Sequence, residues 1–575
     1  MEHKKNRKRL PFGDPSFREI REGDFLYADK TEYIYDMIKF SKYYFLSRPR
    51  RFGKTLLIDT VDELFRGDRK LFDGLWIDAE SDYGFEKHPV LSFNMAYTEV
   101  DTQGDLSDRI KSDIRYAASE EGIKISDESL GEMLGQLLQG LYRKCSLGAV
   151  ILVDESDAPV TDHMSDIELA SECQKVLHDF YRSMKKNFKN IHFALVTGIT
   201  RFAMAALDSG PDNFKDISLL SDFAGICGFT VSDLDKLFKD RYDDTLERLK
   251  ADKSIVWNAK HAGLKAKILQ WYDGYDWLGE EHVLNPYSIL IFFYAMKLES
   301  YWPLSGQPSH LSTLARNNPL EFIQPKLDGH KADEIRKSEL TQLKAVPFLF
   351  HSGYLTIDRI ITREKVIDNK ITQIKEYSFR IPNIEIALDY DSTIFMNAFA
   401  PNGKYLSDLT ENLPDAMVDK NSSEVEMLLH NLLSSISSDQ HMMSAQLCHA
   451  VLHGSLLAAG FDVLSQASAV HGRSYIVLSL NHKVRVVIEL KYCCTDRNVV
   501  EGRDGGKASR DGNVAKGLKE KGRAERELSA SLDEGEKAIR VKDYAGLYRA
   551  ARYAVICLAV AIRGRDEVGA RFVDP

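Results

Sequence analysis

The sequence has no long apolar run, few cysteines and no excess of basic residues. No stretch reaches the roughly 18 apolar residues that a membrane-spanning helix needs, and no signal peptide follows Met1, so we expect a cytoplasmic protein that does not enter a membrane. The seven cysteines have no metal-ligand spacing, and we expect reduced, structural thiols. A formal net charge of −10 argues against a protein that coats nucleic acid, although it leaves room for a local basic groove.

The chain is nevertheless large enough for several domains, each with a core of its own. It has 575 residues, of which 44% are hydrophobic and 28% are charged. We find no internal repeat. The basic run at residues 3–9 is typical of a solvated tail, with an arm that binds a phosphate backbone as the alternative.

A candidate phosphate-binding loop lies near the N-terminus. Residues 47–56 read Ser-Arg-Pro-Arg-Arg-Phe-Gly-Lys-Thr-Leu, with the apolar run 43–46 before them and a helical pattern after them. In such a loop the Lys54 ammonium and the N–H groups of the helix start would hold the β- and γ-phosphates, and the Thr55 hydroxyl would reach Mg²⁺. Arg48 stands where the usual pattern has its first glycine, and a lone Gly-Lys-Thr occurs often by chance.

A second apolar segment, residues 148–153, runs straight into Asp154 and Glu155. A continuous apolar run of this kind is typical of a central parallel strand, whose carboxyl end is where an α/β sheet binds ligands. Asp154 would then hold Mg²⁺ through water, and Glu155 would activate the attacking water as a general base.

A third apolar segment, residues 193–196, ends in Thr197 and is followed by Arg201. Thr197 could sense the γ-phosphate there, and Arg201 could stabilise the charge that develops on it. Each segment alone is equally typical of an ordinary core strand with a polar cap. All three in this order favour a nucleotide site.

At these residues the chain resembles the AAA-ATPase-like proteins that carry a C-terminal nuclease domain of the PD-(D/E)XK superfamily. The similar segments are 10–13, 25–31, 48–55, 154–159, 197–202, 271–275, 285–288, 352–356 and 381–385. Arginines are normal in the phosphate loop of that family. The resemblance implies ATP and Mg²⁺ as cofactors, with Arg50, Arg51, Phe52, Gly53, Lys54, Thr55 and Thr197 around the nucleotide, and Thr55 and Asp154 toward the metal.

The order of predicted elements fits an α/β fold. Between residues 43 and 229 the patterns predict strands at 43–47, 89–95, 148–154, 191–197 and 224–229, and helices at 54–66, 105–121, 127–143 and 166–187. We therefore expect a P-loop NTPase sheet of the additional-strand type over residues 1–230. A helical lid with a hairpin at 360–380 would follow over 231–400, and a restriction-endonuclease-like α/β domain over 401–575.

The C-terminal part carries a weak metal-site pattern. Predicted strands at 461–464, 472–478 and 484–491 end in Glu489-x-Lys491. Glu and Lys at alternate positions are common on edge strands. The resemblance gives them a role, in which Glu489 helps to bind a divalent metal at a phosphodiester and Lys491 steadies the nucleophile or the developing charge.

Three polar positions depart from that family pattern. Tyr475 stands where the metal-binding Asp is expected, Gln466 where an acid is expected, and Ala538 where a glutamine is expected. A phenol is no hard-cation ligand at neutral pH, so we expect a nuclease-like domain that does not cleave. The alternative is that the alignment has slipped and Asp462 supplies the carboxylate. The glycine-rich stretch 495–526 predicts a mobile insertion, with order resuming at residue 534.

The sequence thus predicts an ATP-binding and ATP-hydrolysing protein whose C-terminal domain contacts nucleic acid or a protein partner, without a membrane. An oligomer is compatible with this hypothesis. Two others remain: a slowly hydrolysing, ATP-gated interaction protein, and a metal-dependent nuclease regulated by ATP.

Overall fold

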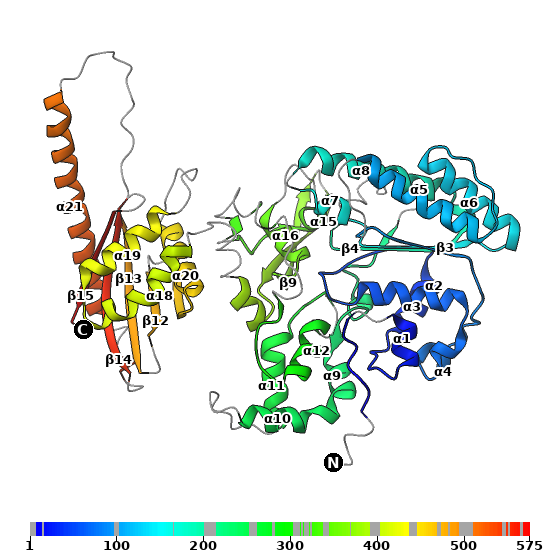
Figure 1. Ribbon diagram of the computed structural model, residues 1–575, viewed down its shortest axis with the longest axis horizontal. Coiled ribbons are helices and arrows are strands. Elements are labelled where there is room, and N and C mark those ends of the chain that lie inside the picture. Colours follow the sequence, from blue (N-terminus) through cyan, green and yellow to red (C-terminus); the bar gives the residue numbers. More distant parts are fainter. Residues whose placement is uncertain are drawn as a thin grey trace. The chain divides into compact units, whose positions relative to one another are not determined.

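The computed structural model divides the chain into two compact units, residues 1–314 with 325–389, and residues 315–324 with 390–575 (Figure 1). Each unit is described by itself. The structure describes residues 7–13, 16–96, 103–164, 166–200, 214–251, 261–278, 282–302, 311, 314, 321–322, 325–336, 344–367, 370–390, 403–435, 445–468, 473–480, 483–493, 510–542, 548–549, 553–563 and 567–574.

The first unit is built on a five-stranded parallel sheet in the order β2-β3-β4-β1-β5. The strands are β1 (Tyr43–Ser47), β2 (Val90–Asn94), β3 (Ala149–Asp154), β4 (Ile191–Gly198) and β5 (Lys215–Asp216). The first four confirm the predicted strands. One strand, β4, lies between β1 and β3 and pairs with both.

The predicted fifth strand at 224–229 is wrong. The fifth strand is the short β5, and β6 (Phe229–Thr230) instead pairs antiparallel with β7 (Val283–Leu284). The apolar character of 223–229 has a different cause, because this segment is buried against the loop that follows β1. The Gly228 N–H donates to the Phe52 carbonyl at 3.0 Å.

Helices cover both faces of this sheet, as predicted (Figure 1). On one face lie α5 (Gln103–Glu120), α6 (Leu130–Cys145) and α8 (Ile167–Lys186), which form one apolar core with β3 and β4. On the other lies α3 (Lys54–Arg66). The remaining helices of this region are α1 (Phe17–Glu22), α2 (Thr31–Phe40), α4 (Trp76–Ala79) and α7 (Ala158–Thr161), and the 3-10 turns are η2 (Arg69–Phe72), η3 (Phe188–Asn190) and η5 (Ser221–Phe223).

The segment after β6 is mainly helical and belongs to the same unit. Its elements are α9 (Val231–Leu237), η6 (Lys239–Arg241), α10 (Tyr242–Ala251), α11 (His261–Tyr272), α12 (Pro286–Ala295), β8 (His330–Lys331), α15 (Ala332–Arg336) and α16 (Ala345–His351). The predicted hairpin is present as β9 (Thr356–Ile367) and β10 (Lys370–Arg380). A second apolar core fills the space between α9 and α12 through Leu234, Phe238, Phe292 and Phe293.

The second unit has a five-stranded mixed sheet in the order β11-β12-β13-β14-β15. Its strands are β11 (Asp462–Ser468), β12 (Arg473–Ser479), β13 (Val484–Cys493), β14 (Ala554–Arg563) and β15 (Glu567–Val573). Its helices are α18 (Gly403–Val418), α19 (Ser422–Ser434), α20 (Ala445–Ala458) and α21 (Arg510–Lys542). Only β13 and β14 are parallel among the described pairs of this sheet.

The long helix α21 corrects the expected mobile insertion at 495–526. Residues 510–526 are helical, while 495–509 lie outside the described residues. Parallel neighbours need a crossover connection, and α21 supplies it by packing Leu532 and Ile539 on the sheet. Further along the same helix Arg523 and Glu527 form an ion pair at 2.7 Å, one turn apart.

Within these described elements, no helix combines the length and the apolar character needed to span a bilayer.

Candidate functional site

The loop between β1 and α3 turns through two residues with left-handed backbone. Arg51 has a φ of 65° and Gly53 a φ of 94°, directly before α3 begins at Lys54. Because the first N–H groups of any helix have no intrahelical partner, this turn aims donors at the space in front of β1. The predicted strand, loop and helix context of the motif is therefore present.

Lys54 lies inside the loop. It is 5% exposed, and its Nζ donates to the carbonyls of Arg48 and Pro49, each at 3.0 Å. The two loop carbonyls thus hold the ammonium group, and a bound phosphate would compete with them for its hydrogen bonds. Thr55, the next residue, is exposed at the start of α3.

Asp154 ends β3 as a buried carboxylate with one oxygen in use. It is 3% exposed, and its Oδ1 accepts from the Thr197 hydroxyl at 2.6 Å and from the Glu155 N–H at 3.0 Å. Its Oδ2 is buried and accepts no hydrogen bond from any residue in the described ranges. A buried carboxylate oxygen without donors suits a hard cation or an ordered water, so Asp154 fits the predicted Mg²⁺ site together with the exposed Thr55 hydroxyl.

Thr197 lies at the end of β4 and is fully buried. We predicted a sensor of the γ-phosphate, and the structure places its hydroxyl on Asp154 instead. In this arrangement Thr197 orients the carboxylate that would face the metal. Arg201, the predicted finger, lies outside the described residues.

Glu155 has an uncommon backbone for a non-glycine residue, with a φ of 49°. Burial raises the pKa of its carboxyl above the ordinary value, the Lys54 charge opposes that rise, and Asp154 adds to it. A left-handed carboxylate with a raised pKa beside a lysine is what a general base needs.

Asp157 has a structural role at the site that the sequence analysis did not predict. Its Oδ1 accepts from the Ile199 N–H at 3.0 Å, and its Oδ2 accepts from the Thr200 N–H at 2.6 Å and hydroxyl at 2.7 Å. These bonds fix the turn after β4 against the turn after β3. A third acid two residues after Glu155 was the available signal.

The other predicted loop residues face different surroundings. Arg50 lies with its Nη2 3.6 Å from Asp162 Oδ1, and its positive charge opposes the burial that raises the pKa of Glu155. Arg51 is exposed, with its guanidinium 5.4 Å from the ring centre of Tyr287. Phe52 is buried and points into the protein.

Arg48 is a buried cation held by carbonyl groups. It is 1% exposed, and its Nη1 donates to the carbonyls of Ser47 and Ser218, each at 2.8 Å. Its Nη2 donates to the Phe223 carbonyl at 3.2 Å, and the guanidinium lies 4.6 Å from the ring centre of Trp277. Burial lowers the pKa of Arg48 to about 10, which keeps it charged at neutral pH.

Four segments that are distant in sequence meet beside the loop. We call them the collar: residues 271–277, 285–302, 352–356 and 380–385. Asn383 Nδ2 donates to the Asp273 carbonyl at 3.0 Å, and the Asp276 N–H donates to the Thr356 hydroxyl at 2.7 Å. Four of the similar segments noted in the sequence, 271–275, 285–288, 352–356 and 381–385, thus belong to the collar.

Glu385 is the central polar group of the collar and is fully buried. Its Oε1 accepts from the Ser288 hydroxyl at 2.8 Å, the Tyr301 N–H at 2.8 Å and the Trp302 N–H at 3.0 Å. Burial raises the pKa of Glu385 to about 7, against the effect of these donors.

In the second unit, Gln466, Tyr475 and Glu489 lie side by side across the sheet, whereas Ala538 lies in α21. Gln466 pairs with Tyr475, and Tyr475 pairs with Glu489. Glu489 is fully buried, and Lys491 Nζ lies 3.4 Å from its Oε1. Asp462 pairs instead with Ser479, at the other end of β11.

The second unit has few side chains that could ligate a metal ion. Throughout the part of the chain that the structure describes, no group of three or more His, Cys, Asp or Glu side chains could hold a metal ion. The register places the Tyr475 phenol, and no second carboxylate, opposite Glu489 on β12.

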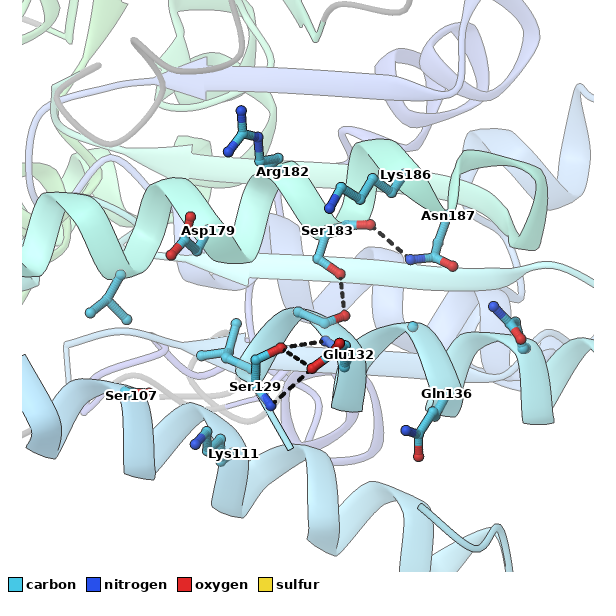
Figure 2. A pocket seen from close by; sticks show the side chains of 15 residues that line it. Ser107, Lys111, Ser129, Glu132, Gln136, Asp179, Arg182, Ser183, Lys186 and Asn187 are labelled. Carbon is cyan, nitrogen blue, oxygen red and sulfur yellow. Dashed lines mark hydrogen bonds between the residues drawn. The ribbon is translucent and has the colours of Figure 1, made fainter. Parts of the chain in front are cut away.

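A polar groove of about 770 Å³ lies between α5, α6 and α8 (Figure 2). None of the predicted site residues lines it. Its nearest polar groups bond one another, because Ser129 and Glu132 form a capping box and the Ser183 hydroxyl donates to the Gly131 carbonyl at 2.6 Å. We therefore place the candidate site at the loop, where the unpartnered Asp154 oxygen and Lys54 are.

Comparison with known proteins supports a nucleotide-binding first unit. Residues 11–208 match the model of the AAA-ATPase-like family, described as "Predicted AAA-ATPase". The matched part contains the loop, Asp154, Glu155 and Thr197. A protein of Azotobacter chroococcum mcd 1, described as "Uncharacterized protein in vnfD 5'region", is 28% identical over 487 residues, which are 83% of this chain and 88% of that protein.

The raised pKa of Glu385 predicts a pH-dependent collar. The folded state holds this proton more tightly than the unfolded chain, so the stabilisation is present below the ordinary pKa of 4.5 and is lost as the pH rises through about 7. Asp389 favours the protonated form, and Tyr275, Tyr301 and Tyr354 are the other titratable groups nearby.

Glu385→Gln should mimic the protonated carboxyl. Its melting temperature should match that of the wild type at pH 5 and exceed it at pH 8, with the exposed Glu364→Gln as control. An equal difference between Glu385→Gln and wild type at both pH values would contradict the assignment.

Proposed function

We propose that the chain binds ATP with Mg²⁺ at the loop of residues 47–55 and hydrolyses it. The observation that carries this proposal is that Lys54, Asp154 and Glu155 lie near one another at the carboxyl ends of β1 and β3, the two strands that flank β4. Lys54 follows β1, the two acids end β3, and β4 lies between these strands. That strand order supports a P-loop NTPase of the additional-strand type.

The residues of the first unit divide the chemistry among them. Lys54 and the N–H groups at the start of α3 hold the β- and γ-phosphates, and Thr55 and Asp154 hold Mg²⁺, which neutralises phosphate charge when it is bound. Thr197 keeps the Asp154 carboxylate oriented through its 2.6 Å hydrogen bond. Glu155 takes the proton of the attacking water.

Arginine would stabilise the charge that develops on the γ-phosphate. Arg50 is a candidate for this role because its charge acts on the Glu155 carboxyl, and Arg51 and Gly53 shape the loop around the phosphates. The assignment of Arg201 as a finger remains a prediction.

The second unit would then be a nuclease-like domain that contacts nucleic acid or a protein partner without cleaving. The sheet order and the register of Gln466, Tyr475 and Glu489 support the comparison that suggested this fold. The absence of a carboxylate at Tyr475 argues against metal-dependent cleavage, in which Glu489 and Lys491 would act. A slowly hydrolysing, ATP-gated interaction protein remains the rival hypothesis, and turnover with and without DNA or RNA separates the two.

Lys54→Ala should weaken MgATP binding by on the order of a hundredfold or more, because a positioned cation in a water-poor site contributes several kcal/mol. Calorimetric titration of the full chain measures this, with the exposed Lys39→Ala as control. An affinity within about threefold of wild type would remove the loop from the site.

Glu155→Gln keeps the shape and loses the base. MgATP should still bind, while steady-state turnover falls by about 10²-fold or more. Glu121→Gln, on the surface of the same unit, serves as control. Turnover at the wild-type level would show that another group activates the water.

The full chain with Mg²⁺ or Mn²⁺ should cut neither DNA nor RNA above background, and Glu489→Ala should leave this result unchanged. Tyr475→Asp should restore at most weak metal binding, since Gln466 and Ala538 are still altered. Metal-dependent cleavage by the wild type that Glu489→Ala abolishes would make nuclease activity the primary function.

A further inference from the structure

The loop residues before Lys54 are packed into the collar. The Arg48 guanidinium stacks on Trp277, and the Phe52 ring lies edge-on to Tyr275 with ring centres 4.8 Å apart. Pro49 packs beside Gly353, where a Cβ would lie 2.9 Å from Pro49 Cβ and 2.7 Å from Trp302 Cη2. Only a glycine at position 353 allows this close approach.

The terminal donors of Arg48 are used on the protein, while its Nε is buried and has no hydrogen-bond partner among the described residues. Its two terminal nitrogens donate to the carbonyls of Ser47, Ser218 and Phe223, and to that of Ala224 at 3.5 Å. Burial opposes the charge of Arg48 and lowers its pKa, and the Asp216 charge acts in the opposite direction. Arg48 therefore has no terminal donor left for a phosphate, and a direct role in binding one does not fit the geometry.

The backbone of Arg48 has a different use. Its carbonyl and that of Pro49 are the two acceptors of Lys54 Nζ. The side chain thus fixes the residue whose carbonyl holds the phosphate-binding lysine. A guanidinium suits this position, since its planar fork reaches several carbonyls at once and stacks on an aromatic face, whereas an ammonium does neither.

We propose that Arg48 is a positioning residue of the nucleotide site, and that the collar acts on MgATP binding through the contact of Arg48 with Trp277. This inference rests on the proposed function of the loop. It explains why an arginine stands here in place of the first glycine of the usual pattern. We call the contacts of Arg48 with Ser218 after β5, Phe223 in η5 and Trp277 in the collar the clamp, and this clamp fixes the shape of the loop.

Substitution of Arg48 or Trp277 should weaken nucleotide binding, although neither side chain contacts the nucleotide in this proposal. Arg48→Met keeps volume but loses the carbonyl bonds, and it should weaken MgATP binding by about tenfold or more, since small misplacements of a binding group are costly. Trp277→Phe keeps an aromatic ring with a weaker face, and it should weaken binding by about threefold. Arg48→Lys should not rescue the loss.

Matched controls exist in the same unit. Arg241 is a second buried arginine, which pairs with Asp240 at 3.1 Å, and Trp76 is a tryptophan of α4 outside the collar. Arg241→Met and Trp76→Phe should leave the affinity for MgATP unchanged, even where they lower the melting temperature. Calorimetry with the slowly hydrolysed analogue MgATPγS on the full chain gives the affinities.

A double variant separates positioning from general loss of stability. Because Arg48 acts through the carbonyls that hold Lys54, Arg48→Met added to Lys54→Ala should cost no further affinity beyond about twofold. If Arg48→Met does not fold, Trp277→Phe decides alone. The proposal would be overturned if Arg48→Met bound MgATPγS with wild-type affinity, or if Trp277→Phe did so where only that variant folds. It would also be overturned if the effects of Arg48→Met and Lys54→Ala on affinity were fully additive. Failure of the wild type to bind MgATPγS would instead overturn the proposed function.

Discussion

The burial of one positive charge organises the first unit. A guanidinium removed from water must find acceptors for its donors, and Arg48 takes them from Ser47, Ser218 and Phe223 while resting on Trp277. These partners come from β1, from the segment after β5, from η5 and from the collar. None of them can move far without leaving a buried cation unsatisfied. The loop that carries Lys54 is therefore held from several sides at once.

The sequence predicted the elements whose pattern is strong. The strands β1, β3 and β4 are continuous apolar runs, and the helices α3, α6 and α8 have long amphipathic patterns, so both kinds were found nearly to their ends. The two-residue β5 escaped because it has almost no pattern, and an apolar segment buried against Phe52 was taken for a strand in its place. Burial alone does not say which neighbour a residue has.

The candidate site was predictable in its residue types and less so in its contacts. Lys54, Asp154 and Glu155 follow from the order of the motifs. The structure shows that Thr197 orients Asp154 and that Asp157 fixes the turn after β4. Both contacts depend on side-chain directions, which the spacing of residues in the sequence does not give. The collar joins segments that are far apart in the chain, and only the folded structure shows that they pack around the same phosphate loop. In the second unit the sequence predicted the strands that carry Tyr475 and Glu489, whereas the pairing of these two residues comes from the structure.

The position of Glu385 has a mechanical consequence. The first unit ends at Asp389, and the chain then enters the second unit at Tyr390. Glu385 lies in the last helical turns before this exit and is tied by three hydrogen bonds to Ser288, Tyr301 and Trp302. These three bonds anchor the segment that leads out of the first unit. Trp302 in turn lies against Gly353 beside Pro49, so this anchor adjoins the residues that pack on the phosphate loop.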